Sequence, residues 1–210
     1  AGGPMSVRDP ETSAYLELLK QALTATLYDE SAWTIEGVGA GRYPKRRPWV
    51  AAAEAVRAVR RFITTAGRRP RALVVRCDPF DPCAAAEGRY WPLFGYTMIG
   101  LHRLNHLERC MADVVANGVP GDFLEAGVWR GGATIFMRAF LKVHGIGERR
   151  VWVADSFAGL PPARGIDAQT GDADLSVLAR LKVSLEQVRA NFARFGMLDE
   201  QVRLHQGWFH

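Results

Sequence analysis

The sequence predicts an α/β protein with a Rossmann-like parallel sheet and helices on both of its faces. Three observations predict this fold class: short apolar strands alternate with helices after residue 121, the strand expected at 150–155 has no polar break in its centre, and glycine turns follow the strands. Unbroken apolar strands are typical of sheets covered on both faces, and strands joined through helices run parallel with right-handed crossovers. We expect a helical, basic extension at 5–95 and the Rossmann-like domain at 96–210.

The extension is predicted to contain two helices separated by loops. Residues 9–29 begin with a Pro-Glu-Thr start signal and carry the broad apolar stripe of an amphipathic helix. Residues 49–63 also have apolar side chains near helical spacing. Residues 71–77 are short enough to form a strand or an extended connector. The segments 31–48 and 78–95 are rich in glycine and proline, so we expect loops there.

The domain shows the alternation of strands and helices that predicts the parallel sheet. A helix is expected over 97–117, where an Asn-Gly-Val-Pro-Gly stop ends it. The elements that follow are a strand at 122–126, a helix at 133–143, a strand at 150–155, a helix at 184–195 and a strand at 201–205. Residues 161–174 are polar and rich in glycine and proline, which predicts a mobile loop over the site.

The composition is that of a soluble globular protein, with 48% hydrophobic and 23% charged residues. No apolar run approaches the roughly 18 to 20 residues that a membrane span needs, so no membrane partner is expected. The three cysteines match no zinc spacing and form no even set for disulfides. We therefore expect reduced thiols and a cytoplasmic protein. Residues 1–4 lack a secretory signal and are interpreted as an artificial leader before a native Met5.

The positive charge is concentrated in one segment. Between Arg42 and Arg76 there are eleven Lys or Arg residues and one acid, Glu54, within a chain of net charge +5. Such a basic stripe can attract the phosphate backbone of a nucleic acid. The arginines at 49–63 would equally form the solvated face of the predicted helix, and this is the interpretation we favour. An anionic partner and, as the less favoured alternative, a nucleic acid stay open.

Candidate ligand-binding residues follow each predicted strand, where a doubly wound sheet binds its ligand. The first strand leads into Glu125-x-Gly127-x-x-x-Gly131-Gly132, whose glycines let the backbone approach a ligand at a helix N-terminus. The second strand ends in Asp155, whose carboxylate can accept both hydroxyls of a ribose. Each feature also has a structural explanation, as a tight turn or a loop cap.

The third strand strengthens the interpretation. It is followed by Gly207 and Trp208, whose ring could flank an adenine, although a tryptophan is more often a core residue. Ser156 directly follows the acid that ends the second strand. Because these features occur in order at three successive strand ends, together they favour a nucleoside ligand.

The identity of the nucleoside is indicated by what surrounds Gly127. The dinucleotide fingerprint is not met, because Val128 and Trp129 follow this glycine and the indole would crowd a pyrophosphate. Glu125 would repel a phosphate but can pair with the ammonium group of an amino acid. A ligand with a ribose and an amino-acid tail, S-adenosylmethionine (SAM), therefore fits better than NAD.

These motifs resemble the macrocin O-methyltransferase family. The resemblance runs from about residue 96 to residue 210, is weaker over the first helix, and rests on motifs at 97–104, 118–122, 125–132, 151–161 and 201–209. It implies a class I methyltransferase fold, SAM as donor, and magnesium-assisted transfer to a sugar hydroxyl of a glycosylated natural product, as in antibiotic tailoring. The acceptor would be a small-molecule glycoside.

The resemblance also implies roles for individual residues. Glu125 would hold the SAM ammonium group, Gly127 would form the backbone turn, Asp155 would hold the ribose, and Trp208 would lie at the adenine. Thr97 and Met98 would close the site from the other side. The site residues predicted for the cofactor are thus Thr97, Met98, Glu125, Gly127, Gly131, Asp155, Ser156, Gly207 and Trp208.

The sequence departs from the family pattern in two places. Residues 36–95 are longer and more basic than expected, so no role is carried over there. The family's later strands, metal ligands and base are not present among these 210 residues, so no catalytic residue and no metal ligand is assigned. Asp172 and Asp174 are expected to be solvated loop residues. The first strand would then be an apolar sheet edge, which invites association or aggregation. Either these residues are a piece of a longer protein or the missing strands are supplied by something else, and a homo-oligomer is expected.

Three alternatives differ in class from a sugar O-methyltransferase. The chain could be a non-catalytic or assembly module with at most a nucleoside half-site. It could be a nicotinamide-dependent dehydrogenase, which Glu125 and Trp129 disfavour. It could be a nucleic-acid methyltransferase that uses the basic segment. The sequence does not identify the acceptor sugar or its hydroxyl.

Overall fold

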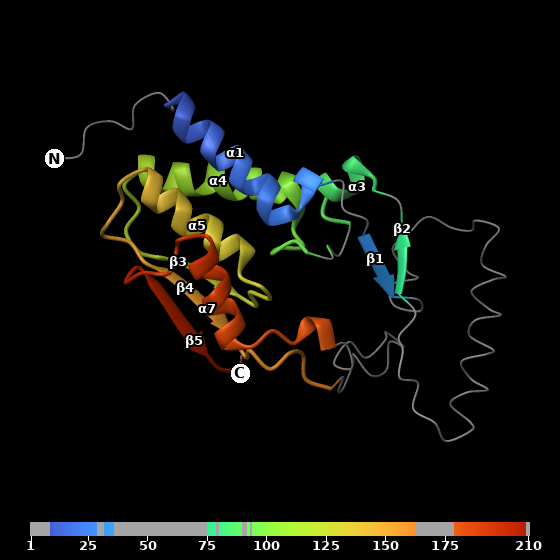
Figure 1. Ribbon diagram of the computed structural model, residues 1–210. Coiled ribbons are helices and arrows are strands. Elements are labelled where there is room, and N and C mark those ends of the chain that lie inside the picture. The colour runs from blue at the N-terminus through green and yellow to red at the C-terminus, as the bar shows by residue number, and fades with distance from the viewer. Residues whose placement is uncertain are drawn as a thin grey trace, which may run out of the picture.

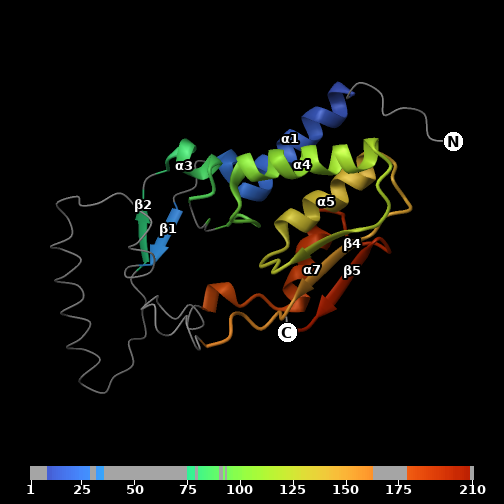
Figure 2. The ribbon, with the colours of Figure 1, turned by 180° about the vertical axis from the view of Figure 1, so that it is seen from behind.

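A three-stranded parallel sheet and the helices stacked on it form the body of the protein in this computed structural model (Figure 1). The structure describes residues 9–28, 32–35, 75–78, 80–89, 92, 94–162 and 179–208. A separate two-stranded sheet lies away from this body, as both views show (Figures 1 and 2). No helix within the described ranges is long and apolar enough to cross a membrane.

The parallel sheet contains the three strands that the sequence predicts. They are β3 (Phe123–Ala126), β4 (Val151–Asp155) and β5 (Val202–Gln206). Their order is β3-β4-β5, and Phe123 pairs with Val151, which pairs with Val202. The register brings the carboxyl ends of the three strands to one edge, where the candidate ligand-binding residues were expected.

The described helices cover one face of this sheet. Helix α5 (Gly132–Val143) connects β3 to β4, and α7 (Leu185–Arg194) connects β4 to β5. Both right-handed crossovers move in the same direction along the sheet, so both helices lie on the same face. Val153 on this face is fully buried, whereas Leu124 on the other face is 62% exposed. The expected helices are therefore present on one face in the described part of the chain.

Helix α5 is the centre of the helical layer. Every residue from 132 to 141 is buried, because the sheet lies on one side and α1 (Pro10–Thr24) and α4 (Gly100–Ala116) pack on the other (Figure 2). Leu16, Leu19 and Leu23 of α1 belong to the same core as Phe136 of α5. Helix α1 is thus part of the core of the domain, although we expected it in the extension at 5–95.

Two helices begin where the sequence predicts their start, and a third begins later. The side chains of Asp9 and Ser184 cap α1 and α7 by accepting backbone N–H bonds. Helix α4 begins at Gly100, later than the expected Thr97. Gly100 has φ +71°, and a Cβ there would lie 2.3 Å from the backbone nitrogen of Gly88. This close packing against a distant segment sets the start of the helix, which local spacing does not show.

The prediction of loops at 31–48 and 78–95 is wrong in part. Strand β1 (Ala32–Ile35) pairs antiparallel with β2 (Val75–Asp78), so residues 75–77 form a strand, which is one of the two possibilities expected for 71–77. A short helix, α3 (Pro82–Ala86), begins where Asp81 accepts N–H bonds from residues 83 and 84. Single 3-10 turns lie at Thr26–Tyr28 (η1) and Ala179–Leu181 (η3). The helix expected at 49–63, the basic segment around it and most of the loop at 161–174 lie outside the described residues.

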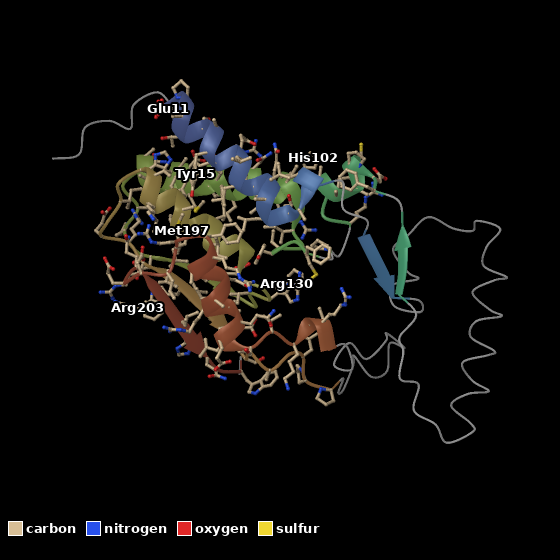
Figure 3. The ribbon with its side chains drawn as sticks, viewed as in Figure 1. Glu11, Tyr15, His102, Arg130, Met197 and Arg203 are labelled. Atoms are coloured by element: carbon tan, nitrogen blue, oxygen red, sulfur yellow. The ribbon has the colours of Figure 1, made fainter. Side chains whose placement is uncertain are left out.

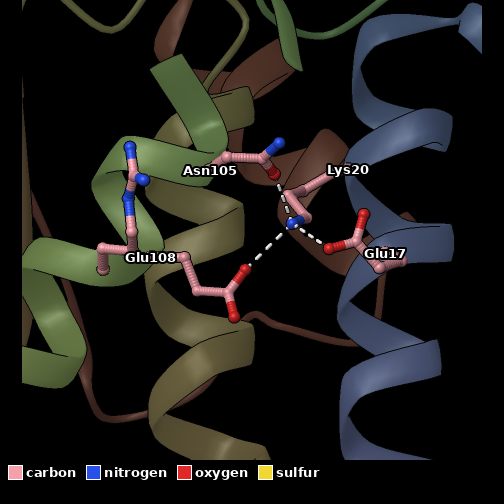
Figure 4. A pocket seen from close by; sticks show the side chains of 5 residues that line it. Glu17, Lys20, Asn105 and Glu108 are labelled. Carbon is pink, nitrogen blue, oxygen red and sulfur yellow. Dashed lines mark hydrogen bonds and ion pairs between the residues drawn. The ribbon is translucent and has the colours of Figure 1, made fainter. Parts of the chain in front are cut away.

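A buried ammonium group joins α1 to α4 (Figure 4). Lys20 is 1% exposed, and its Nζ donates to Glu17 Oε1 (2.5 Å), Asn105 Oδ1 (2.5 Å) and Glu108 Oε2 (2.9 Å). Three acceptors match the three N–H donors of the ammonium group. Because breaking a buried ion pair typically costs about 3 to 5 kcal/mol, this cluster holds α1 in register on α4.

Candidate functional site

Asp155 organises the loops at the carboxyl edge of the sheet. Its Oδ2 accepts hydrogen bonds from the backbone nitrogens of Val128 (2.8 Å) and Trp129 (3.4 Å). Its Oδ1 accepts from the backbone nitrogen of Phe157 (2.9 Å) and from Ser156 Oγ (3.4 Å). One side chain at the end of β4 therefore ties the loop that follows β3 to the loop that follows β4.

The two tied loops each contain an aromatic residue in the left-handed region. Trp129 has φ +50° and Phe157 has φ +52°. A residue with a side chain in this region costs about 1 to 3 kcal/mol and persists only where its surroundings hold it. The backbone nitrogens of both residues donate to Asp155, which is thus the group that holds them. Such backbone strain is concentrated at ligand-binding edges, which supports a site here.

Backbone hydrogen bonds bring the predicted glycines to the same edge. Gly127 N donates to the carbonyl of Ala154 (2.8 Å), and Gly207 N donates to the carbonyl of Asp155 (2.9 Å). Gly127 has φ +83°, and a Cβ built on it would meet no atom within 4 Å. Glycine is needed there for its backbone conformation, and the space beside it is open. Trp208, next to Gly207, is 47% exposed.

The segment that precedes α4 lies against the N-terminus of α5. We call residues 94–98 the facing segment. Gly132 N donates to the carbonyl of Tyr96 (3.0 Å), and a Cβ on Gly132 would lie 2.5 Å from that oxygen. Thr97 is buried and Met98 half-buried in this segment. The structure therefore places Thr97 and Met98 beside the glycine turn, and their contact with a cofactor stays a prediction.

Gly131 performs a packing role at the start of α5. It caps the helix with φ +84°, and a Cβ there would lie 3.2 Å from Val188 Cγ1 of α7. Ser156 is likewise engaged within the protein, since its Oγ donates to the carbonyl of Gly159 (3.0 Å) and accepts from Ala158 N (3.1 Å). Both residues shape the edge of the sheet, and a direct ligand contact of either one stays a prediction.

Glu125 carries the unusual carboxyl group of the site. Its Oε2 is inaccessible to solvent and has no hydrogen-bond partner in the described part of the chain. Burial raises the pKa of this carboxyl, the hydrogen bond from the backbone of Thr134 lowers it, and the negative charge of Asp155 raises it again, which gives a pKa of about 8. The group is therefore mostly protonated at neutral pH. A buried, unpaired carboxyl group offers a place for a positively charged group.

Trp129, Arg130 and Asn191 contribute contacts that the sequence did not reveal. Trp129 Nε1 donates to the carbonyl of Arg180 (2.9 Å), and the Arg130 guanidinium lies 4.3 Å from the centre of the Trp129 ring. Arg130 is labelled in Figure 3. Arg130 also donates to the carbonyl of Gly95 (2.7 Å), and Asn191 Nδ2 donates to the carbonyl of Arg130 (3.0 Å). A signal existed for Asn191, because it lies on the apolar stripe of its helix, where a polar residue is unexpected.

The described residues do not fit a metal site. Within the described ranges, no group of three or more His, Cys, Asp or Glu side chains is arranged to hold an ion. Asp172 and Asp174, which the sequence analysis regarded as solvated, lie outside these ranges. The magnesium ion implied by the resemblance therefore stays a prediction.

Comparison with known proteins gives a consistent result. The macrocin O-methyltransferase family matches residues 12–210. The chain is 54% identical over 125 residues to 8-demethyl-8-(2,3-dimethoxy-alpha-L-rhamnosyl)-tetracenomycin-C 4'-O-methyltransferase of Streptomyces olivaceus, covering 58% of this chain and 48% of that protein. It is 51% identical over 126 residues to demethyldecarbamoylnovobiocin O-methyltransferase of Streptomyces niveus, covering 59% and 48%.

A solved structure supports the same relationship. The O-methyltransferase NovP superposes with a TM-score of 0.67 and 34% sequence identity, covering 94% of this chain and 64% of that chain. The matches above cover 48% of each of the two relatives, so the chain spans about half the length of these two proteins.

Proposed function

The chain belongs to the macrocin O-methyltransferase family, and on this premise we propose that it forms the cofactor-binding part of a SAM-dependent O-methyltransferase. The acceptor we propose is a sugar hydroxyl of a glycosylated natural product. The names of the relatives support this acceptor class, since they describe a rhamnosyl-tetracenomycin 4'-O-methyltransferase and a novobiocin-pathway O-methyltransferase. SAM is the donor expected for a methyltransferase of this family.

The observation that carries the proposal is the unpaired oxygen of Glu125. SAM differs from NAD and ATP at this end of the molecule, because SAM has an ammonium group where they have phosphates. A buried carboxyl group beside a second carboxylate gains a favourable partner when a cation reaches it, because a nearby positive charge favours its ionised form, whereas the negative charge of a phosphate offers no such partner. The chemistry of this edge of the sheet thus favours an amino-acid tail.

Asp155 supports the ribose half of the proposal in a modified form. Its two oxygens already accept four hydrogen bonds, which uses the usual capacity of a carboxylate. Two of these bonds are short (2.8 and 2.9 Å) and two are long (3.4 Å), to Trp129 N and Ser156 Oγ. We propose that a ribose hydroxyl replaces the long bond from Ser156 Oγ, while the bonds from the backbone nitrogens keep the loops in place.

The reaction we propose is a direct displacement. A lone pair of the acceptor oxygen attacks the methyl carbon, the carbon–sulfur bond breaks, and the sulfonium becomes a neutral thioether. The hydroxyl proton leaves the acceptor. Holding donor and acceptor in line accounts for much of such a rate enhancement, and this positioning is the contribution we assign to the loops at the carboxyl edge. No described residue is assigned as the base.

The setting of the enzyme is also a proposal. We expect a cytoplasmic enzyme that forms homo-oligomers. The exposed Leu124 on the open face of β3 supports association, because an apolar strand at the edge of a sheet is a ready surface for contact.

Isothermal titration calorimetry tests the proposed cofactor. The chain is titrated with SAM, with its product S-adenosylhomocysteine (SAH) and with NAD. We expect micromolar binding of SAM and SAH and none of NAD. A folded, monodisperse sample that binds NAD, or that binds neither SAM nor SAH, would contradict the proposal.

A further inference from the structure

Among the described residues, the charged groups around Glu125 leave its carboxyl group without a positive partner. Asp155 at the end of β4 contributes a second negative charge. Arg130, in the loop before α5, donates to a backbone carbonyl and lies over an indole ring. Arg138 of α5 makes a bidentate contact with Asp199, and the facing segment carries no charged residue. The environment of Glu125 therefore disfavours its ionised form in the free protein.

The carboxyl group of Glu125 lies near the first turn of α5, since a backbone hydrogen bond from Thr134 lowers its pKa. The Oε2 of Glu125 is inaccessible to solvent and has no hydrogen-bond partner in the described part of the chain. Burial raises the pKa of Glu125 to about 8, which agrees with this arrangement. A cation that reached Oε2 would reverse the balance, because a nearby opposite charge favours the ionised form.

We propose that binding of the cofactor's amino-acid tail releases one proton from Glu125 to the solvent. This inference rests on the proposed function and adds a linkage between cofactor affinity and pH. The O–H bond of the neutral carboxyl group breaks, the proton passes to a water or buffer base, and the resulting carboxylate accepts a hydrogen bond from the ammonium group. The number of protons and the total charge are the same before and after this step, and no oxidation or reduction is involved.

The linkage has a calculable size. Below pH 8, the fraction of Glu125 that is ionised in the free protein changes close to tenfold per pH unit. The association constant for SAH should therefore rise nearly tenfold between pH 6 and pH 7, where the ammonium group of the ligand stays protonated. Close to one proton should be released for each SAH bound at pH 6.5.

Calorimetry in two buffers of different ionisation enthalpy, phosphate and imidazole, measures the proton release directly. The full chain is titrated with SAH at pH 6.5, and the dependence of the observed enthalpy on the buffer gives the number of protons. Adenosine, which has the ribose and base but no amino-acid tail, serves as the control ligand. The variant Glu125→Gln removes the titrating group without changing the shape of the side chain, and the exposed Glu148→Gln is the matched control.

The expected result is one proton released with SAH and none with adenosine in the wild type and in E148Q. In E125Q the release should disappear and the pH dependence of affinity should flatten. SAH binding without proton release would overturn this inference and leave the proposed function intact. Proton release that persists in E125Q would overturn the assignment to Glu125. Absence of SAH binding to the folded wild type would instead contradict the proposed function.

Discussion

The substitution Glu125→Gln gives a prediction about stability whose size follows from the structure. The unfolded carboxyl group has its ordinary pKa near 4.5, whereas the folded one has a pKa of about 8. Between these values the unfolded state ionises and the folded state keeps its proton, so the folded state binds more protons. The free energy of unfolding contributed by Glu125 is therefore fully present below pH 4.5 and is lost progressively as the pH rises through 8.

The magnitude is worked from the same two pKa values. Each pH unit in this window corresponds to about 1.4 kcal/mol. From pH 5 to pH 7 the wild type should lose about 2 to 3 kcal/mol of unfolding free energy relative to E125Q, whose amide does not titrate. This loss is large beside the roughly 5 to 15 kcal/mol that typically stabilise a domain.

Urea denaturation at pH 5, 6, 7 and 8, followed by tryptophan fluorescence, measures this difference. E148Q, which changes an exposed glutamate, should follow the wild type across the series. Equal pH dependence of the wild type and E125Q would refute the reasoning. A wild type that gained stability relative to E125Q as the pH rose would show that Glu125 is ionised in the folded state.

Three further substitutions test the packing around the site. Gly132→Ala should destabilise the fold by about 1 to 3 kcal/mol through overpacking and weaken SAH binding, because the new methyl group would lie 2.5 Å from the carbonyl oxygen of Tyr96. The control Gly147→Ala, whose methyl group would have nothing within 4 Å, should bind SAH like the wild type. Equal SAH affinities of the two variants in calorimetry would contradict this prediction. Lys20→Ala should cost about 3 to 5 kcal/mol in urea denaturation, since it removes the buried cation that donates to Asn105 and Glu108, and a loss below 1 kcal/mol would show that the ion cluster is not needed. Ser184→Ala should cost about 1 kcal/mol through loss of the α7 cap, and an unchanged midpoint of thermal unfolding would exclude the cap.

The parallel sheet could be predicted because its signals are local. Each strand from β3 to β5 is short and either ends in an acid or is followed by a glycine, and Ser184 marks the start of α7. The first sheet could not be predicted in the same way. Ala32 pairs with Asp78, a partner 46 residues away, and nothing near Ala32 in the sequence indicates that pairing.

The residue types of the site could be predicted from the sequence. Their hydrogen bonds and protonation states could not. The carboxylate of Asp155 was expected to bind a ribose, but in the structure its oxygens accept hydrogen bonds from backbone nitrogens of the neighbouring loops. Glu125 was expected to be a charged partner for an ammonium group, but enclosure by α5 and the sheet keeps it neutral in the free protein. Both states depend on groups brought together by the fold. The strained backbone of Trp129 has the same origin, since it depends on a hydrogen bond to Asp155.

A crystal structure of the chain with SAH tests the central claim most directly. We predict that SAH lies at the carboxyl edge of the sheet, with its ammonium nitrogen about 2.7 to 2.9 Å from an oxygen of Glu125 and its ribose at Asp155. An SAH molecule whose amino-acid tail lay away from Glu125, with the carboxyl group still enclosed and unpaired, would contradict it.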